Sequence, residues 1–176
     1  LKKINSEVVG WITVNNTNIN YPIVQHNDNS YYLSHSIDQS KNRGGWIFMD
    51  YRNNSKNLNR NTIIYGHDRA DKSMFATLKN VLKEEWYTNK ENQNFTLWTI
   101  NKKYDLQVFS VYKIPTTTDY LQTDFSTLED YQIFLNLITE RSIYDFQARP
   151  STTDKIVTLS SCFNDYIKVV LHAKVV

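Results

Sequence analysis

The feature that most constrains this chain is an apolar, β-branched run that ends at its only cysteine. Residues 156–159 are Ile, Val, Thr and Leu; they follow Pro150 and Asp154 and lead through two serines to Cys162. A short run of this kind is typical of a buried strand. A thiol at the end of a strand is held by rigid backbone and can still reach solvent, as a nucleophile must. The alternative interpretation is a small core residue, because free cysteine is among the most buried residue types.

The composition favours one globular domain over residues 1–176. A chain of 176 residues with 40% hydrophobic and 22% charged residues is long enough to bury one core. The net charge of +2 is spread over interspersed residues of both signs, so the sequence lacks the basic patch of a nucleic-acid-binding protein. One cysteine excludes an intrachain disulfide and argues against a cysteine-rich zinc site. We therefore expect no metal and no cofactor.

The sequence contains no segment that could itself span a membrane. No apolar stretch approaches the roughly 18–20 residues needed to cross a bilayer, and there is no signal peptide. The chain opens at Leu1-Lys2-Lys3 without an initiator methionine. We therefore expect that an N-terminal anchor or targeting segment has been removed. A single cysteine fits the cytosol or a bacterial surface that does not depend on disulfides.

Many short strands separated by turn-forming residues predict a mostly β fold, a β-barrel with added helices. Strands are expected over residues 11–14, 19–25, 46–49, 62–65, 95–100, 104–113, 156–159 and 169–175. Helices are expected over 1–11 and over 73–82, the second with Ser73 as its N-cap. A third helix follows the capping box from Ser126 to Glu129, with Tyr131, Phe134, Leu135 and Ile138 on one face.

Four histidines are available to activate the thiol, whose free pKa of roughly 8.5 leaves little thiolate at neutral pH. His26 and His35 lie in polar loops, where a solvated surface imidazole is the simpler interpretation. His172 lies within the last expected strand, as a structural or surface residue. His67 follows a strand and Gly66, so its ring is placed by rigid scaffold where the backbone can turn sharply.

Two separated stretches are more specific together than either is alone. Residues 65–67 are Tyr-Gly-His, with Ser-Met-Phe at 73–75, and residues 158–162 are Thr-Leu-Ser-Ser-Cys. Together they resemble the active-site motifs of the sortases, most closely class B, and the likeness continues through residues 9–12, 21–25, 31–33, 48–52 and 109–112. The resemblance implies a single sortase catalytic domain: a closed eight-stranded β-barrel, an N-terminal helix, and a helix in the loop before the cysteine strand.

The same resemblance implies cysteine transpeptidation at the cell wall of Gram-positive bacteria. Cys162 would attack the carbonyl of a threonine in the C-terminal sorting signal of a surface protein, giving a thioacyl-enzyme. His67 would protonate the leaving amine and then deprotonate an incoming amine of a peptidoglycan precursor or cross-bridge. In this family the two residues act as a reverse-protonated pair, so a minor fraction of enzyme is competent at neutral pH. The enzyme would work at the extracellular face of the membrane, held by an N-terminal anchor.

The family's third active-site residue is an arginine on the strand after the cysteine, which stabilises the oxyanion. Counting back from residues 172–174 puts Lys168 at its place, and the connection over residues 163–167 is shorter than the family's. Lysine supplies charge without the planar fork of a guanidinium. Three explanations stay open: a true lysine variant, residues missing before Lys168, or an arginine from elsewhere. The alternative interpretation is a solvated lysine at a strand edge.

The resemblance also implies a substrate groove. Its residues, assigned position by position, are Asn29, Leu33, Tyr65, Thr116, Tyr120, Leu121 and Ser160. Of these, Tyr65, Leu33 and Leu121 could equally belong to the core, because large apolar side chains usually face inward. A class-B-like enzyme implies a sorting motif of the Asn-Pro-x-Thr-x type.

Two other kinds of function stay open on the residues alone. One is a hydrolytic cysteine protease that uses the same cysteine and histidine with water as the acceptor. The other is a non-catalytic β-barrel binding module in which Cys162 is inert. Product analysis with an added amine separates the first from a transpeptidase, and the rate of thiol alkylation against pH separates the second.

Overall fold

The structure is a computed structural model that describes residues 1–162 and 166–176, with the backbone alone described at Cys162. Of the short connection expected over residues 163–167, residues 163–165 lie outside the described residues. The strands are β1 (Val8–Thr13), β2 (Asn20–Val24), β3 (Phe48–Met49), β4 (Asn61–His67), β5 (Asn94–Thr99), β6 (Lys103–Pro115), β7 (Ile156–Cys162) and β8 (Ile167–Val175).

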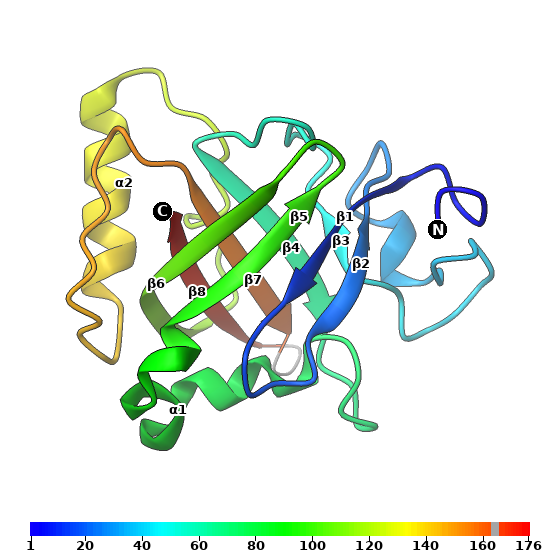
Figure 1. Ribbon diagram of the computed structural model, residues 1–176, viewed down its shortest axis with the longest axis horizontal. Helices are drawn as coiled ribbons and strands as arrows, with labels where there is room; N and C mark the ends of the chain where they lie inside the picture. Colours follow the sequence, from blue (N-terminus) through cyan, green and yellow to red (C-terminus); the bar gives the residue numbers. More distant parts are fainter. Residues whose placement is uncertain (163–165) are drawn as a thin grey trace.

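The strands close into a barrel in the order β1-β2-β3-β4-β7-β8-β6-β5 over the described part of the chain (Figure 1). The pair β4–β7 and the single contact of β2 with β3 are parallel, whereas the other neighbouring pairs are antiparallel. The predicted barrel is therefore confirmed. The expected strands lie where the sequence puts them, with bounds that shift by a few residues.

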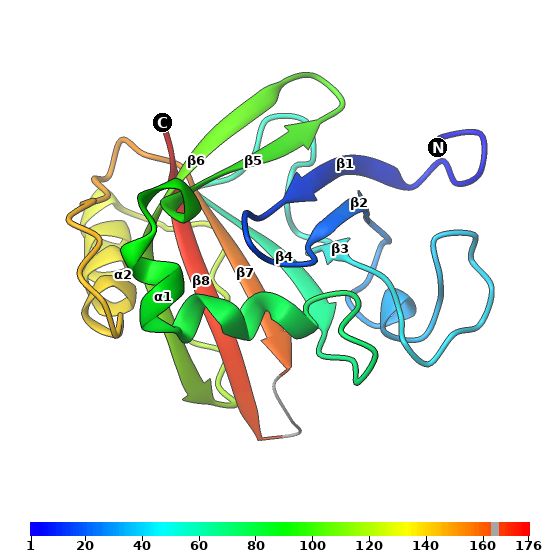
Figure 2. The same ribbon diagram turned by 60° about the horizontal axis from the view of Figure 1, so that its bottom comes forward.

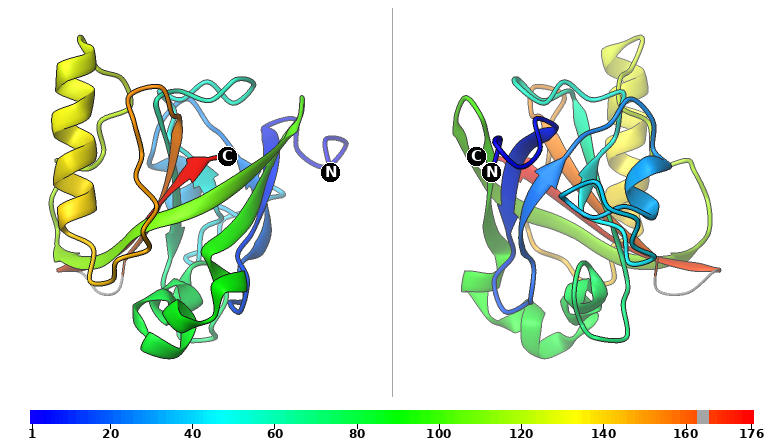
Figure 3. Two further views of the ribbon diagram at one scale, coloured as in Figure 1. Left: turned by 60° about the vertical axis from the view of Figure 1, so that its left-hand side comes forward. Right: turned by 90° about the vertical axis from the view of Figure 1, so that its right-hand side faces the viewer.

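The helices cover the outside and one end of the barrel. They are the α-helices α1 (Glu84–Thr88) and α2 (Leu128–Glu140) and the 3₁₀ helices η1 (Tyr31–Leu33), η2 (Ala76–Leu82) and η3 (Lys90–Gln93). In Figure 2, η2 and α1 cross one end of the barrel, where Leu78, Val81 and Trp86 join the central core. Figure 3 shows α2 and the N-terminal segment on opposite sides of the barrel.

The helix predicted from the capping box is confirmed as α2. Its apolar face (Tyr131, Phe134, Leu135 and Ile138) packs against β6 and β8 in a second core cluster. The N-cap is Thr127 rather than Ser126, and its side chain accepts a hydrogen bond from the backbone N–H of Asp130. The sequence pattern therefore located this helix to within one residue of its start.

The predicted N-terminal helix over residues 1–11 is wrong. Residues 2–4 and 6–7 form turns, and β1 begins at Val8. The expected apolar face has nothing to pack against, since Ile4 is exposed, whereas Val8 and Val9 are buried. Pairing of β1 with both β2 and β5 satisfies the backbone and suits two adjacent valines better than a helix does.

The helix expected over 73–82 is shorter and of another type. It is the 3₁₀ helix η2, which begins at Ala76, and Ser73 does not cap it. The Ser73 hydroxyl and backbone N–H both donate to Asp71, and Met74 has a φ of 56°. A left-handed residue at this position prevents a regular helix from starting at Ser73.

His172 sits in the barrel wall as a neutral, structural residue. It is fully buried, with Nδ1 2.8 Å from the Thr158 hydroxyl and Nε2 2.8 Å from the Tyr112 hydroxyl. Because Thr158 donates its own proton to Asn61, Nδ1 must carry the imidazole proton and Nε2 must accept from Tyr112. Burial, with a smaller contribution from the charge of Arg141, lowers the pKa of His172 from 6.5 to about 3.

The first prediction concerns this histidine. Between its folded and unfolded pKa values only unfolded His172 binds a proton, so the free energy of unfolding falls as pH falls below about 6.5. In the variant His172→Gln this contribution is absent. From pH 7 to pH 5 the wild type should therefore lose about 2 kcal/mol more than the variant. Urea unfolding of both proteins at the two pH values measures the difference, and parallel losses would contradict it.

Gly66, the residue before His67, lets β4 pack closely against the side chains of Ile47 and Phe75. A Cβ atom on Gly66 would lie 2.5 Å from Ile47 Cδ1 and 2.6 Å from Phe75 Cγ, both deep in the core. The backbone N–H of Phe75 in turn donates to the carbonyl of His67. At Gly44, by contrast, the nearest atoms belong to the end of the flexible Arg69 side chain.

The second prediction compares these two glycines. Gly66→Ala should lower the free energy of unfolding by about 1–3 kcal/mol, because a packed core must move to admit the methyl group. Gly44→Ala is the matched control and should have little effect, since Arg69 can turn away and its exposed ion pair contributes at most about 1 kcal/mol. Thermal unfolding ranks the two variants. A Gly66→Ala protein as stable as Gly44→Ala would show that Phe75 is not held where we describe it.

Candidate active site

Three predicted residues are brought together by strand register. In the parallel pair β4–β7, His67 is the partner of Cys162, and in the antiparallel pair β7–β8, Cys162 is the partner of Lys168. Neighbouring strands lie about 4.8 Å apart, so these three backbone positions are adjacent in one row of the sheet. The backbone of Cys162 therefore lies between those of His67 and Lys168.

A cavity of about 370 Å³ opens at this end of the strands. Every residue assigned to the site from the sequence whose side chain the structure describes contributes to its lining: His67, Lys168, Asn29, Leu33, Tyr65, Thr116, Tyr120, Leu121 and Ser160. Among the described residues, four more line the cavity that were not predicted from the sequence: Phe48, Gly66, Thr117 and Thr118. Phe48 and Gly66 lie in segments that carried the resemblance, whereas nothing in the sequence distinguished the two threonines.

His67 has a fixed ring orientation. Its Nε2 lies 2.9 Å from the carbonyl oxygen of Leu33, so Nε2 carries a proton and donates it. Beneath the ring, Gly45 has a φ of 58°, and a Cβ there would lie 3.0 Å from His67 Cδ2 and 2.3 Å from the Tyr32 carbonyl oxygen. Position 45 therefore has to be glycine for the Leu33 carbonyl and the His67 imidazole to come within hydrogen-bonding distance.

The other histidines have different surroundings. His26 bonds to Glu7 and stacks on Tyr31, and His35 stacks on Tyr31 as well. His172 is enclosed in the barrel wall. Among the residues that the structure describes, His67 is the one histidine that lines the cavity.

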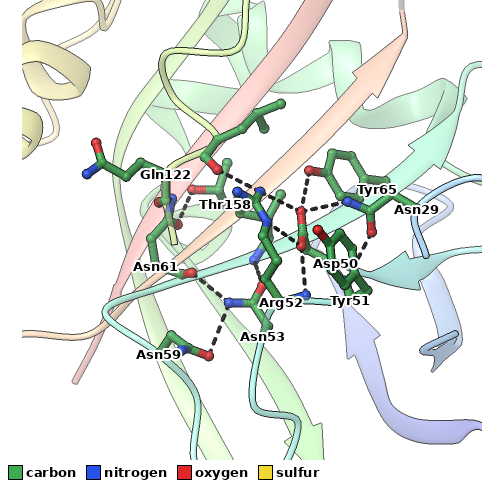
Figure 4. Close-up of polar contacts among 12 residues, drawn as sticks. Asn29, Asp50, Tyr51, Arg52, Asn53, Asn59, Asn61, Tyr65, Gln122 and Thr158 are labelled. Carbon is green, nitrogen blue, oxygen red and sulfur yellow. Dashed lines mark hydrogen bonds and ion pairs between the residues drawn. The ribbon is translucent and has the colours of Figure 1, made fainter. Parts of the chain in front are cut away.

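One side of the cavity is held by a buried carboxylate. The Asp50 side chain is fully buried and accepts hydrogen bonds from the Tyr65 hydroxyl (2.8 Å) and the Asn29 amide (2.9 Å), as Figure 4 shows. It also accepts from Nε and Nη2 of Arg52, each at 2.9 Å. Burial alone would raise the pKa of Asp50, but the hydrogen bonds from Arg52 and Tyr65 outweigh it and the net pKa is lowered. Asp50 is therefore ionised at neutral pH.

The same environment keeps Tyr65 protonated. Burial raises the pKa of Tyr65, and the negative charge of Asp50 raises it further. The hydroxyl proton is used in the bond to Asp50, so the remaining lone pairs of this oxygen can accept a hydrogen bond.

The other side of the cavity includes residues 116–118, 120 and 121, which lie in the segment directly after β6 in the chain. Tyr120 is buried, and its hydroxyl lies 2.8 Å from the Ser160 hydroxyl. The three residues that could equally have been core are not fully buried: Leu33 is exposed, and Tyr65 and Leu121 are half-buried. Both sides of the cavity therefore present a mixture of apolar surface and hydroxyl groups.

Lys168 is half-buried and lines the cavity opposite the backbone of Cys162. Within residues 1–162 and 166–176, no arginine is among the side chains that line the cavity. The nearby Arg52 is bound to Asp50 and to the carbonyl of Leu121. These contacts disfavour the explanation that an arginine from elsewhere takes the family position.

The described residues contain no cluster of three or more His, Cys, Asp or Glu side chains that could hold a metal ion. None of the described helices has both the length and the apolar character that crossing a membrane requires.

The family model described as Sortase domain matches residues 12–176. Sortase B of Staphylococcus aureus (strain NCTC 8325 / PS 47) is 41% identical over 182 residues, covering 100% of this chain and 73% of the relative. The structure of sortase B from B. anthracis in complex with AAEK1 is 47% identical with a TM-score of 0.91, covering 99% of this chain and 81% of that one.

Two further sortase B structures are also similar. The Staphylococcus aureus sortase B–substrate complex gives a TM-score of 0.92 at 38% identity, covering 99% of this chain and 82% of that chain. A sortase B complex with triglycine gives a TM-score of 0.93 at 38% identity, covering 99% of this chain and 83% of that chain. The family model, the sequence identity across the given chain and the barrel geometry agree. The chain therefore belongs to the sortase family and, within it, to the class B sortases, which are cysteine transpeptidases.

Proposed function

We propose that this enzyme cleaves a C-terminal sorting signal after its threonine and joins the new carboxyl end to a peptidoglycan amine, with Cys162 as the nucleophile. The observation that carries the proposal is the strand register, in which the backbone of Cys162 is paired with both His67 and Lys168. The sortase B relatives, solved with substrate and with triglycine, support a peptide donor and a glycine-type amine acceptor.

In the first half of the reaction the Cys162 thiolate attacks the threonine carbonyl carbon. The carbonyl π electrons move to oxygen, giving a tetrahedral oxyanion. This intermediate collapses, the C–N bond breaks, and His67 gives its proton to the leaving amine. The product is a thioester between Cys162 and the threonine. In the second half, an incoming amine attacks this thioester, His67 accepts a proton from the amine, and the thiolate leaves.

Lys168 is proposed as the oxyanion donor. An ammonium at this position would stabilise negative charge as it develops on the carbonyl oxygen. Its half-buried position at the cavity and its pairing with Cys162 support this role. Lysine acts as a point charge, whereas the family's arginine can donate two parallel hydrogen bonds.

The cavity is proposed to hold the sorting peptide between two walls. Leu33 and Leu121 offer apolar surface, and Asn29 and Tyr65 offer polar groups. Thr116, Tyr120 and Ser160 complete the assigned set. This mixture suits a peptide of the Asn-Pro-x-Thr-x type, which carries both an amide and apolar segments.

Sortases are associated with the cell wall and membrane of Gram-positive bacteria. We place the enzyme at the extracellular face of the cell membrane, held there by an N-terminal anchor. Its donors would be surface proteins that carry a sorting signal, and its acceptor a peptidoglycan precursor or cross-bridge amine.

The third prediction tests the nucleophile and its partner histidine. Cys162→Ala should abolish cleavage and transfer, and His67→Ala should lower kcat/KM by about 10²–10⁴-fold, since general acid–base catalysis is lost. His26→Ala and His35→Ala are the matched controls and should stay near wild type. The measurement uses a panel of fluorogenic sorting peptides with and without triglycine, with products identified by mass spectrometry.

Residual turnover by Cys162→Ala, or similar losses in the three histidine variants, would refute these roles. A hydrolysed product alone, even with triglycine present, would identify a cysteine protease. Slow, solvent-like alkylation of Cys162 at every pH would instead identify a binding module.

The fourth prediction concerns the oxyanion. Lys168→Ala should reduce kcat by about 10²–10³-fold, the usual cost of one oxyanion donor, with a smaller change in KM. Lys168→Arg should match or exceed the wild-type rate because it restores the family residue. Steady-state kinetics distinguish an oxyanion donor from a solvated lysine at a strand edge. A rate for Lys168→Ala within about threefold of wild type would give the oxyanion role to another group.

A further inference from the structure

We propose that Asp50 and Arg52 are positioning residues that fix the separation of the two cavity walls; we call this ion pair the Asp50–Arg52 clasp. Neither residue is among the described residues that line the cavity. The inference rests on the proposed function, because it takes the cavity to be the groove that holds the peptide.

Asp50 holds the wall that contains Asn29 and Tyr65. Both side chains donate to the same carboxylate oxygen of Asp50, Asn29 at 2.9 Å and Tyr65 at 2.8 Å. The Asn29 side-chain oxygen also accepts from the backbone N–H of Tyr51 at 3.0 Å. Because both ends of the Asn29 amide are engaged, its nitrogen and oxygen cannot exchange places without breaking both bonds. Asp50 therefore sets the positions of two groove side chains from different segments.

Arg52 reaches across the groove. Its Nε and Nη2 bind the two oxygens of Asp50, and Nη2 also donates to the carbonyl oxygen of Leu121 at 2.8 Å. The planar guanidinium holds these three acceptors in one fixed geometry. The ion pair, drawn with Asn29 and Tyr65 in Figure 4, thus connects these two side chains on one wall to the backbone carbonyl of Leu121 on the other.

The second wall is also held by Asn61. Side-chain Nδ2 of the buried Asn61 donates to the carbonyls of Tyr120 (3.3 Å) and Gln122 (2.8 Å), on either side of Leu121. The Asn61 backbone N–H donates to the carbonyl of Thr123 at 3.2 Å. These contacts attach the wall to β4, whereas Arg52 ties it to Asp50. Without Arg52 we therefore expect the wall to stay attached but to lose its fixed distance from Asn29 and Tyr65.

Arg52 is the better residue to vary. Asp50 is buried, and its removal would leave Asn29, Tyr65 and Arg52 without their shared acceptor, which risks unfolding the region. The Arg52 side chain is 39% exposed, so a shorter polar side chain can be accommodated. Arg149→Gln is the matched control, because Arg149 forms a 2.9 Å ion pair with Asp145 on an exposed surface away from this cavity.

The kinetic test separates groove geometry from chemistry. For Arg52→Gln we expect KM for a sorting peptide to rise on the order of tenfold, the cost of one charged hydrogen bond, with kcat within about threefold of wild type. Arg52→Lys should recover only part of the loss, since one ammonium cannot bind three acceptors in a plane. Arg149→Gln should leave both constants unchanged. A fall in kcat with unchanged KM would overturn the positioning role.

A second readout does not depend on turnover. The backbone amide of Tyr51 donates to the Asn29 side chain, and that of Leu121 donates to the Thr118 carbonyl. Hydrogen exchange of both amides should be faster in Arg52→Gln than in wild type and unchanged in Arg149→Gln. Unchanged exchange in Arg52→Gln would overturn the clasp, even if the variant melted at a lower temperature. If wild-type enzyme turned over no sorting peptide, the proposed function would fail while the exchange data still decided the clasp.

Discussion

The parallel pairing of β4 with β7 is the constraint on which the rest of the site depends. It joins two stretches far apart in the chain and makes His67 the partner of Cys162 and Tyr65 the partner of Ser160. A slip of one residue would turn every side chain of a strand to the other face of the sheet. The register is held by the buried hydrogen bond from Thr158 to Asn61, residues 97 positions apart, and His172 bonds to the same threonine hydroxyl.

Buried polar groups give this barrel the geometry that apolar packing alone would leave loose. Asn61 and Asp50 are both fully buried, and each binds partners from several segments. Such networks stabilise a fold only when their members are satisfied. The Asp50 carboxylate accepts from Asn29, Tyr65 and Arg52, and the Asn61 amide bonds to Thr158 and to two backbone carbonyls. The cavity, which we propose as the peptide groove, is therefore built on fixed hydrogen bonds beneath its surface.

The charges around the site are divided between two tasks. Arg52 has the planar fork that could hold an oxyanion, but Asp50 and the Leu121 carbonyl occupy it. Lys168 lies at the cavity next to the backbone of Cys162, with one compact charge. A fork is needed where three acceptors must be held in a plane, whereas a single developing negative charge can be stabilised by an ammonium alone.

Local pattern in the sequence was enough to predict the strands and the helix α2, because periodicity and short motifs are properties of neighbouring residues. The residues around the cavity were predicted from the resemblance to the sortases. Tertiary structure decided the remainder. Residues 1–11 have helical spacing, yet pairing with β2 and β5 draws Val8 and Val9 into a strand. The clasp could not be foreseen either, since Arg52 meets the Leu121 carbonyl 69 positions away, and a backbone acceptor leaves no mark in the sequence.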